Sequence, residues 1–158
     1  MIFNKNLKNI LLVVFATLIL SACSTAKKSG NIDGDVYTGK ETVEYLASGV
    51  PDRIFFATNK SSLTTASRAT LRKQANYLRK NKKLSVTIEG HADERGTREY
   101  NLALGDKRAF SVYSYLAQAG IDTNRMEYVS WGKERPEVIG SDETAYSQNR
   151  RGVTIVSN

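Results

Sequence analysis

The chemically richest stretch of the chain is GHADERGTREYN, residues 90–101, which contains the only histidine. Its ionisable side chains, of both signs, are His91, Asp93, Glu94, Arg95, Arg98 and Glu99. Such a set fits a metal centre, a catalytic centre, a solvated loop whose charges cancel, or a site for a ligand that carries both charges.

A metal centre and a catalytic centre are the weaker interpretations. The only nearby metal ligands would be one imidazole and carboxylates. There is no HExxH pair, and the one cysteine, Cys23, lies far away in the sequence. A hydrolase would use His91 as a base, but no serine stands in a G-x-S-x-G context. We therefore expect no metal, no cofactor and no enzymatic activity. A solvated loop, in which a neighbouring group hydrogen-bonds to His91, remains an alternative interpretation.

The residues after this loop favour a ligand site. A helix is predicted from Asn101 to Ala119, ending at Gly120. At 100° per residue, one stripe of it faces the core and a second runs beside it towards the loop. The core stripe holds Leu102, Ala109, Tyr113 and Leu116, and the second holds Asn101, Leu104 and Arg108.

Arg108 can therefore meet Asp93 across the mouth of the loop, with both side chains partly exposed. A carboxylate receives an ammonium group, and a guanidinium holds a carboxylate through two hydrogen bonds. The two residues together would recognise a zwitterion such as an amino-acid head group. Without a ligand they could simply pair with each other.

The surrounding pattern predicts the elements that position this loop. Strands are expected at residues 53–58, 84–90, 126–132 and 151–157, and a first helix within residues 63–83 buries Leu71, Ala75 and Leu78. The order is β-α-β-α-β-β, which predicts an α/β sandwich with two main helices on one face of a mixed sheet. Residues 40–49 are expected to form one or two helical turns that stop at Gly49.

The N-terminus has the pattern of an export signal. Lys5 and Lys8 precede an apolar run, residues 10–20, that is shorter than the ~20 residues of a membrane span. Small residues then lead to Cys23, as in a bacterial lipobox. We expect a signal peptide at 1–22, a lipidated N-terminus and flexible tether at 23–49, and a folded domain at 50–158. The formal net charge is +7, or +5 without Lys5 and Lys8 of the signal peptide. This excess attracts polyanions, but an exported chain is not expected to bind nucleic acid.

Three separated motifs carry a family resemblance: IEGHADERGTREYNLALGDKRAFSVYSYLAQAGI, VSWGKERP and AYSQNRRGV. Together they resemble the OmpA-like peptidoglycan-binding domains, in the form found in the lipoproteins of the Tol-Pal system, over residues 50–156. The resemblance implies that the loop and helix bind the diaminopimelate of the peptidoglycan stem peptide. By similarity, the binding residues are Asp93 for the ammonium, Arg108 for the carboxylate, Thr97 and Asn101 as hydrogen-bonding groups, Leu104 along the apolar stem, and Thr58 and Asn59 in the turn after the first strand.

The chain departs from the family at that turn, because relatives usually have an aspartate where Asn59 stands; backbone N–H groups at Thr58 and Asn59 could still serve. The resemblance also implies an outer-membrane protein facing the periplasm, held by lipid on Cys23, with roles in the cell envelope and cell division. Its implied partners are peptidoglycan and Tol proteins, above all TolB. The competing hypothesis is an enzyme that cleaves peptidoglycan, with His91 and Asp93 or Glu94 as acid and base.

Four further residues are open to two interpretations. Tyr100 and Trp131 are expected in the core, although either ring could stack on a sugar. Arg150 and Arg151 are structural or rim residues by similarity, and a solvated charge pair is equally consistent with the sequence.

Overall fold

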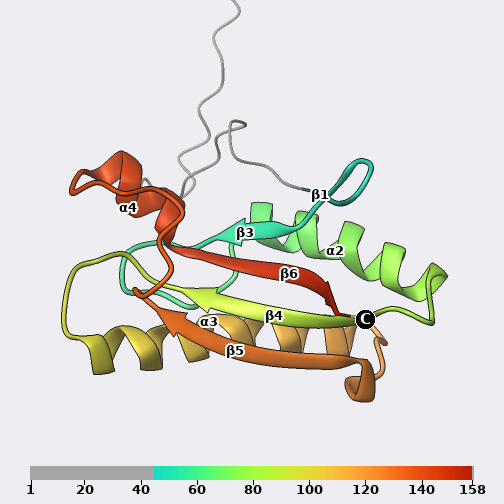
Figure 1. The fold of residues 1–158 in the computed structure, drawn as a ribbon. Coiled ribbons are helices and arrows are strands. Elements are labelled where there is room, and N and C mark those ends of the chain that lie inside the picture. Colours follow the sequence, from blue (N-terminus) through green and yellow to red (C-terminus); the bar gives the residue numbers. More distant parts are fainter. Residues whose placement is uncertain (1–44, 158) are drawn as a thin grey trace, which may run out of the picture. The chain divides into compact units, whose positions relative to one another are not determined.

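The computed structural model describes residues 45–157, and its centre is a mixed four-stranded sheet (Figure 1). The strand order is β3-β6-β4-β5, with β6 antiparallel to both β3 and β4, and β5 parallel to β4. The bounds are β3 (Arg53–Phe55), α2 (Thr65–Lys80), β4 (Ser85–His91), α3 (Arg98–Gln118), β5 (Met126–Gly132) and β6 (Arg151–Ser157). Helices α2 and α3 cover one face of the sheet, so the predicted order and layer arrangement are confirmed.

Two regions differ from the predicted elements. The helical turns expected before Gly49 are wrong for Tyr45–Ala47, which form strand β1 and pair with β2 (Val50–Pro51). Gly49 has a φ of 74° and makes the turn between them, a conformation that glycine adopts without a steric penalty. The predicted signal peptide, Cys23 and most of the tether lie outside the described residues.

A third helix, α4 (Glu143–Asn149), and the short 3-10 helix η1 (Thr123–Arg125) were not predicted. Helix α4 is too short to show an apolar period. Its start is nevertheless marked, because the carboxylate of Asp142 accepts a hydrogen bond from the backbone N–H of Ala145 at 2.8 Å.

One apolar core lies between the sheet and its two main helices. Leu71, Ala75 and Leu78 of α2 are buried as predicted, and they meet Ile88 of β4 and Val112 of α3. Between residues 45 and 157 no helix is long and apolar enough to cross a bilayer.

The inward face of α3 is rotated from the predicted one. Leu102, expected in the core, is 50% exposed, whereas Asn101, Leu104 and Arg108 are buried. The cause is a close crossing of α3 over β4: a Cβ built on Gly90 would lie 1.9 Å from the carbonyl oxygen of Gly105. Two glycines let the helix backbone approach the strand here, and the stripe that contains Arg108 is therefore turned towards the sheet.

Candidate ligand-binding site

The charged loop leaves the C-terminal end of β4 and enters α3, as predicted. Thr97 is the N-cap residue of α3, and its hydroxyl accepts a hydrogen bond from the backbone N–H of Tyr100 at 3.2 Å. The side-chain amide of Asn101 donates to the carbonyl oxygen of Arg95 at 2.9 Å and holds the loop against the helix. Both residues are therefore placed at the mouth of the loop by the start of the helix.

The carboxylate of Asp93 lies at the base of the loop and is only 7% exposed. Arg95 donates to it from its backbone N–H at 3.1 Å and from Nη2 at 2.6 Å, and Nη1 of Arg150 lies 3.4 Å away. Burial opposes ionisation of Asp93, but the hydrogen bonds from Arg95 outweigh it, so the pKa of this carboxyl lies below its usual value. Asp93 is thus an ionised, enclosed acceptor.

The guanidinium group of Arg108 is fully buried and joins two backbone segments through three carbonyl oxygens. It donates to the carbonyl oxygens of Lys60 at 2.9 Å, His91 at 2.8 Å and Ala57 at 3.1 Å. Burial lowers the pKa of Arg108 to about 10, although the charge of Asp93 opposes this shift. Arg108 remains protonated near neutral pH and locks the β3–α2 turn against the end of β4.

The turn that follows β3 forms the other wall of the site. The backbone N–H of Lys60 donates to the carbonyl oxygen of Ala57 at 3.1 Å, and Asn59 between them has a φ of 55°. Asparagine tolerates this left-handed conformation better than most residues do. Within residues 45–157 no hydrogen bond uses the backbone N–H groups of Thr58 and Asn59.

The predicted site residues therefore meet, but not in the expected way. Loop and turn are connected directly, because Nη2 of Arg95 lies 3.5 Å from the hydroxyl of Thr58. Asp93 and Arg108 do not pair with each other: the carboxylate binds Arg95 and Arg150, and the guanidinium binds carbonyl oxygens. The expectation that both are partly exposed is wrong, because the loop, the turn and α3 enclose them.

Helix α4 contributes contacts that the sequence interpretation missed. Arg150, at its C-cap, is fully buried and donates to the carbonyl oxygen of Phe56 at 3.1 Å and to Glu143 at 2.6 Å. The hydroxyl of Tyr146 donates to Glu94 at 2.9 Å, and the guanidinium of Arg95 lies 4.4 Å from the centre of the Tyr146 ring. The only signal for this was the AYSQNRRGV motif.

Arg151 is also buried, and its Nη2 lies 3.3 Å from Glu137. A solvated Arg150–Arg151 charge pair is therefore wrong, because both guanidinium groups are enclosed.

His91 is buried, and one of its two ring nitrogens has a side-chain partner. Its Nε2 lies 3.3 Å from Oε2 of Glu89. Burial, helped by the charge of Arg151, lowers the pKa of His91 to about 3, so the ring is neutral near pH 7. No group of three or more potential metal ligands occurs among the residues that the structure describes.

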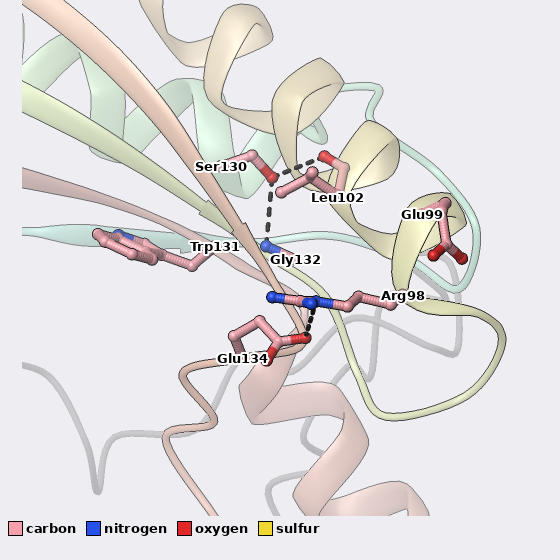
Figure 2. Close-up of a pocket in the computed structure, with 7 residues that line it drawn as sticks. All are labelled: Arg98, Glu99, Leu102, Ser130, Trp131, Gly132 and Glu134. Atoms are coloured by element: carbon pink, nitrogen blue, oxygen red, sulfur yellow. Dashed lines mark hydrogen bonds and ion pairs between the residues drawn. The ribbon is translucent and has the colours of Figure 1, made fainter.

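A cavity of about 440 Å³ lies between the first turn of α3 and the end of β5 (Figure 2). Its lining residues are Arg98, Glu99, Leu102, Ser130, Trp131, Gly132 and Glu134. An ion pair of 3.1 Å joins Arg98 to Glu134. The cavity contains none of the predicted ligand residues, so it is separate from the Asp93 site. Trp131 is half-buried and Tyr100 is 48% exposed, which makes the predicted core role wrong for Tyr100.

Comparison with known proteins shows the family and agrees with the fold. Residues 55–150 match the OmpA family. A peptidoglycan-associated lipoprotein of Brucella melitensis is 42% identical over 153 residues, which are 94% of this chain and 91% of the relative. The crystal structure of the peptidoglycan-associated lipoprotein from Burkholderia pseudomallei superposes with a TM-score of 0.65 and 40% identity, covering 67% of this chain and 90% of that one.

The cell wall anchor of the T6SS from Pseudomonas aeruginosa is a more distant neighbour. It superposes with a TM-score of 0.57 at 26% identity and covers 68% of this chain and 84% of that one. The chain therefore belongs to the OmpA family and, within it, to the peptidoglycan-associated lipoproteins.

Proposed function

We propose that this chain is a lipid-anchored outer-membrane protein that binds peptidoglycan non-covalently through the diaminopimelate of the stem peptide. The observation that carries the proposal is the 42% identity, over 94% of the chain, to a relative whose name states both peptidoglycan association and lipid modification. The domain acts as a binding module, and the buried, neutral His91 gives no support to an acid–base role.

Asp93 is the proposed receptor for the ligand ammonium. Its carboxylate is ionised and enclosed, and the group that covers it from the solvent side is Arg95, whose side chain is 42% exposed. An incoming ammonium takes the place of the Arg95 guanidinium, so the charge of Asp93 stays compensated throughout. Arg150, fully buried, keeps its contact with Asp93 in both states.

The ligand carboxylate is proposed to bind the turn at Thr58 and Asn59. Their backbone N–H groups have no partner within the described part of the chain, and Arg108 supplies positive charge from beneath the same turn. Thr97 and Asn101 hydrogen-bond the ligand from the start of α3, and Leu104 lines its apolar stem. In this arrangement Arg108 acts on the carboxylate mainly by holding the turn and by its charge.

The anchor and the partners complete the proposal. Cys23 carries the lipid, and Ser24 after it favours sorting to the outer membrane with the domain in the periplasm. As a component of the Tol-Pal system of the envelope and of cell division, the chain binds TolB on a surface that overlaps the wall site.

Co-sedimentation of residues 24–158 with purified sacculi tests this function. We expect binding that free diaminopimelate competes away, and a 10- to 100-fold loss in Asp93→Asn, because a charged hydrogen bond contributes ~1.5–3 kcal/mol. Lys107→Gln, an exposed change on α3, is the matched control and should bind normally. Sacculi with lysine in place of diaminopimelate should bind poorly. Normal binding by a folded Asp93→Asn variant would refute the site, and soluble muropeptides released over time would show an enzyme instead.

A further inference from the structure

The positive charge of the folded domain is concentrated on α2 and the loop after it. Residues 65–83 contain seven Lys and Arg and no Asp or Glu. The rest of residues 45–157 contains eleven Lys and Arg and twelve Asp and Glu. The positive excess of the domain therefore belongs to one element rather than to its whole surface. We call the seven side chains the basic surface: Arg68, Arg72, Lys73, Arg79, Lys80, Lys82 and Lys83.

The basic surface is a continuous, exposed face. All seven side chains are exposed. At 100° per residue, the five on α2 fall within an arc of about 140° that excludes the face carrying Leu71, Ala75 and Leu78. A helix needs only its buried face for packing, so the core does not require this arrangement of charge.

The charges of the basic surface are not neutralised locally. None of the seven forms an ion pair with a carboxylate within residues 45–157. By contrast, Arg53, Arg95 and Arg98 all pair with carboxylates elsewhere in the domain. The field of the basic surface is therefore directed into solvent.

A shallow cavity of about 460 Å³ lies at the C-terminal end of this surface. Arg79, Lys82, Asp122 and Arg125 line it together with Gly120. The guanidinium of Arg125 is held by the carbonyl oxygens of Leu84 at 2.8 Å and Asn81 at 2.9 Å. Three basic side chains, with Arg125 fixed in place, therefore share this cavity with one carboxylate, Asp122, so its lining carries a net positive charge.

The basic surface is densest at the end of the domain opposite the proposed wall site. Four of its seven side chains lie at residues 79–83, where α2 ends and the loop to β4 begins. Strand β4 starts at this end and finishes at the Asp93 loop (Figure 1). Seven strand residues span roughly 20 Å, so the two sites are separated by the length of the sheet.

We propose that the basic surface docks onto an anionic phospholipid leaflet and directs the Asp93 site away from the membrane towards the wall. This rests on the proposed lipid anchor, which would hold the domain close enough to the leaflet for weak charge contacts to act. A leaflet of anionic headgroups matches a broad, unpaired basic face better than a pocket ligand does, because each side chain contributes independently near such a surface.

Vesicle flotation with residues 24–158, which carry no acyl chain, tests the proposal. The described fold and its core lie wholly within this segment. We expect binding to vesicles that contain phosphatidylglycerol, none to pure phosphatidylcholine, and release by salt. The triple variant Lys80→Gln, Lys82→Gln, Lys83→Gln should bind about 100-fold more weakly, because each basic side chain near an anionic leaflet contributes roughly a five-fold factor.

The matched control is Lys60→Gln, Arg98→Gln, Lys107→Gln, which removes the same charge from exposed positions outside the basic surface. Its vesicle binding should weaken by less than about five-fold. Equal losses in both triple variants, or no binding of the unmodified segment to anionic vesicles, would overturn the proposal. So would a loss of sacculus binding in the Lys80, Lys82, Lys83 variant with vesicle binding intact, because the basic surface would then belong to the acidic wall polymer. Normal sacculus binding by this variant separates the inference from the proposed function.

Discussion

Arg108 donates from all three of its guanidinium nitrogens to the carbonyl oxygens of Ala57, Lys60 and His91. A lysine ammonium also has three donors, but they share one nitrogen and cannot match carbonyl oxygens arranged around a planar guanidinium. Arg108→Lys should therefore lower the free energy of unfolding by roughly 2–5 kcal/mol, since each buried group left unpaired costs ~1–3 kcal/mol. Urea denaturation measures this, with the neighbouring exposed change Lys107→Gln as the control. Unchanged stability with weakened sacculus binding would instead make Arg108 purely a ligand group.

For Arg95 we expect the opposite effect, on ligand binding rather than on stability. Its exposed guanidinium competes with a ligand ammonium for Asp93. Arg95→Gln should lower the melting temperature only slightly, because the enclosed Asp93 carboxylate keeps Arg150 and the backbone N–H of residue 95 as partners. It should strengthen sacculus binding up to about five-fold, because an ion pair with a half-exposed partner contributes on the order of 1 kcal/mol. Competition by free diaminopimelate provides the measurement. Weaker binding would mean that Arg95 itself contacts the ligand.

His91 links stability to acidity. The ring is neutral in the folded state down to a pKa of about 3, because it is buried near Arg151. In the unfolded chain it binds a proton below about pH 6.5. The unfolded state therefore holds the extra proton, and stability rises with pH between these two values. From pH 7 to pH 5 the free energy of unfolding should fall by about 2 kcal/mol.

His91→Gln is the test of this pH dependence, because its side chain has similar length and does not titrate. Denaturant titrations at pH 5, 6 and 7 should show a clearly smaller slope than the unmodified chain. An equal slope would assign the pH dependence to other groups.

At the scale of residues, the sequence is informative about neighbours along the chain. The position of the loop was predicted because a strand end, a charged stretch and a helix start fall within twelve residues, whereas the ligand roles of Thr97 and Asn101 came from the family resemblance. The partners of Asp93 and Arg108 were not predictable in this way. Arg150 is 57 positions from Asp93, and Ala57 is 51 positions from Arg108, so only the folded chain brings them together.

At the scale of elements, the close crossing of α3 over β4 sets the position of the site. A Cβ on Gly105 would lie 2.8 Å from the carbonyl oxygen of Gly90 and 2.3 Å from the hydroxyl of Ser130. Gly105→Ala should therefore push the helix off the strand and cost about 3 kcal/mol. It should also weaken sacculus binding, because Arg108 follows one turn later.

Gly120→Ala is the control for that substitution. Gly120 has a φ of 86° and no atom near its Cβ position, so only backbone strain of roughly 1 kcal/mol is added there. Calorimetry on both variants would distinguish them, and equal losses would remove the crossing as the cause.

The elements that the sequence predicted well are those with a local signal. Strand β5 matches its predicted bounds, and β4 differs by one residue at each end, because alternation along a strand is a local signal. Leu102 was wrongly predicted to lie in the core because the buried face of the helix was assigned from apolar residues alone. That assignment holds only where the buried face is apolar. Here α3 buries Asn101 and Arg108 as well. Helix α4 and the β1–β2 hairpin are too short for a period to develop.

At the scale of the whole molecule, the proposed function is bivalent, with lipid on Cys23 at one end of the chain and peptidoglycan at the Asp93 site. Two linked contacts hold far more firmly than either alone, but each remains separable by mutation. The informative variant for the lipid end is Leu20→Ala with Cys23→Ser. It converts residues 20–22 to an ordinary Ala-x-Ala cleavage site, so the leader is still removed while no thiol remains to be acylated.

We expect this variant to lose palmitate labelling and to be released from membranes by a wash at about 1 M salt, which screens the charges of the basic surface. It should still bind sacculi. Asp93→Asn should show the reverse: palmitate labelling and membrane retention persist, and sacculus binding falls. Combining the changes should remove both attachments, because the two contacts lie on separate parts of the chain. Fractionation and sacculus co-sedimentation on the same extracts measure all three outcomes. An unlabelled variant that stays in salt-washed membranes would contradict the role of Cys23, and loss of sacculus binding in that variant would contradict the independence of the two ends.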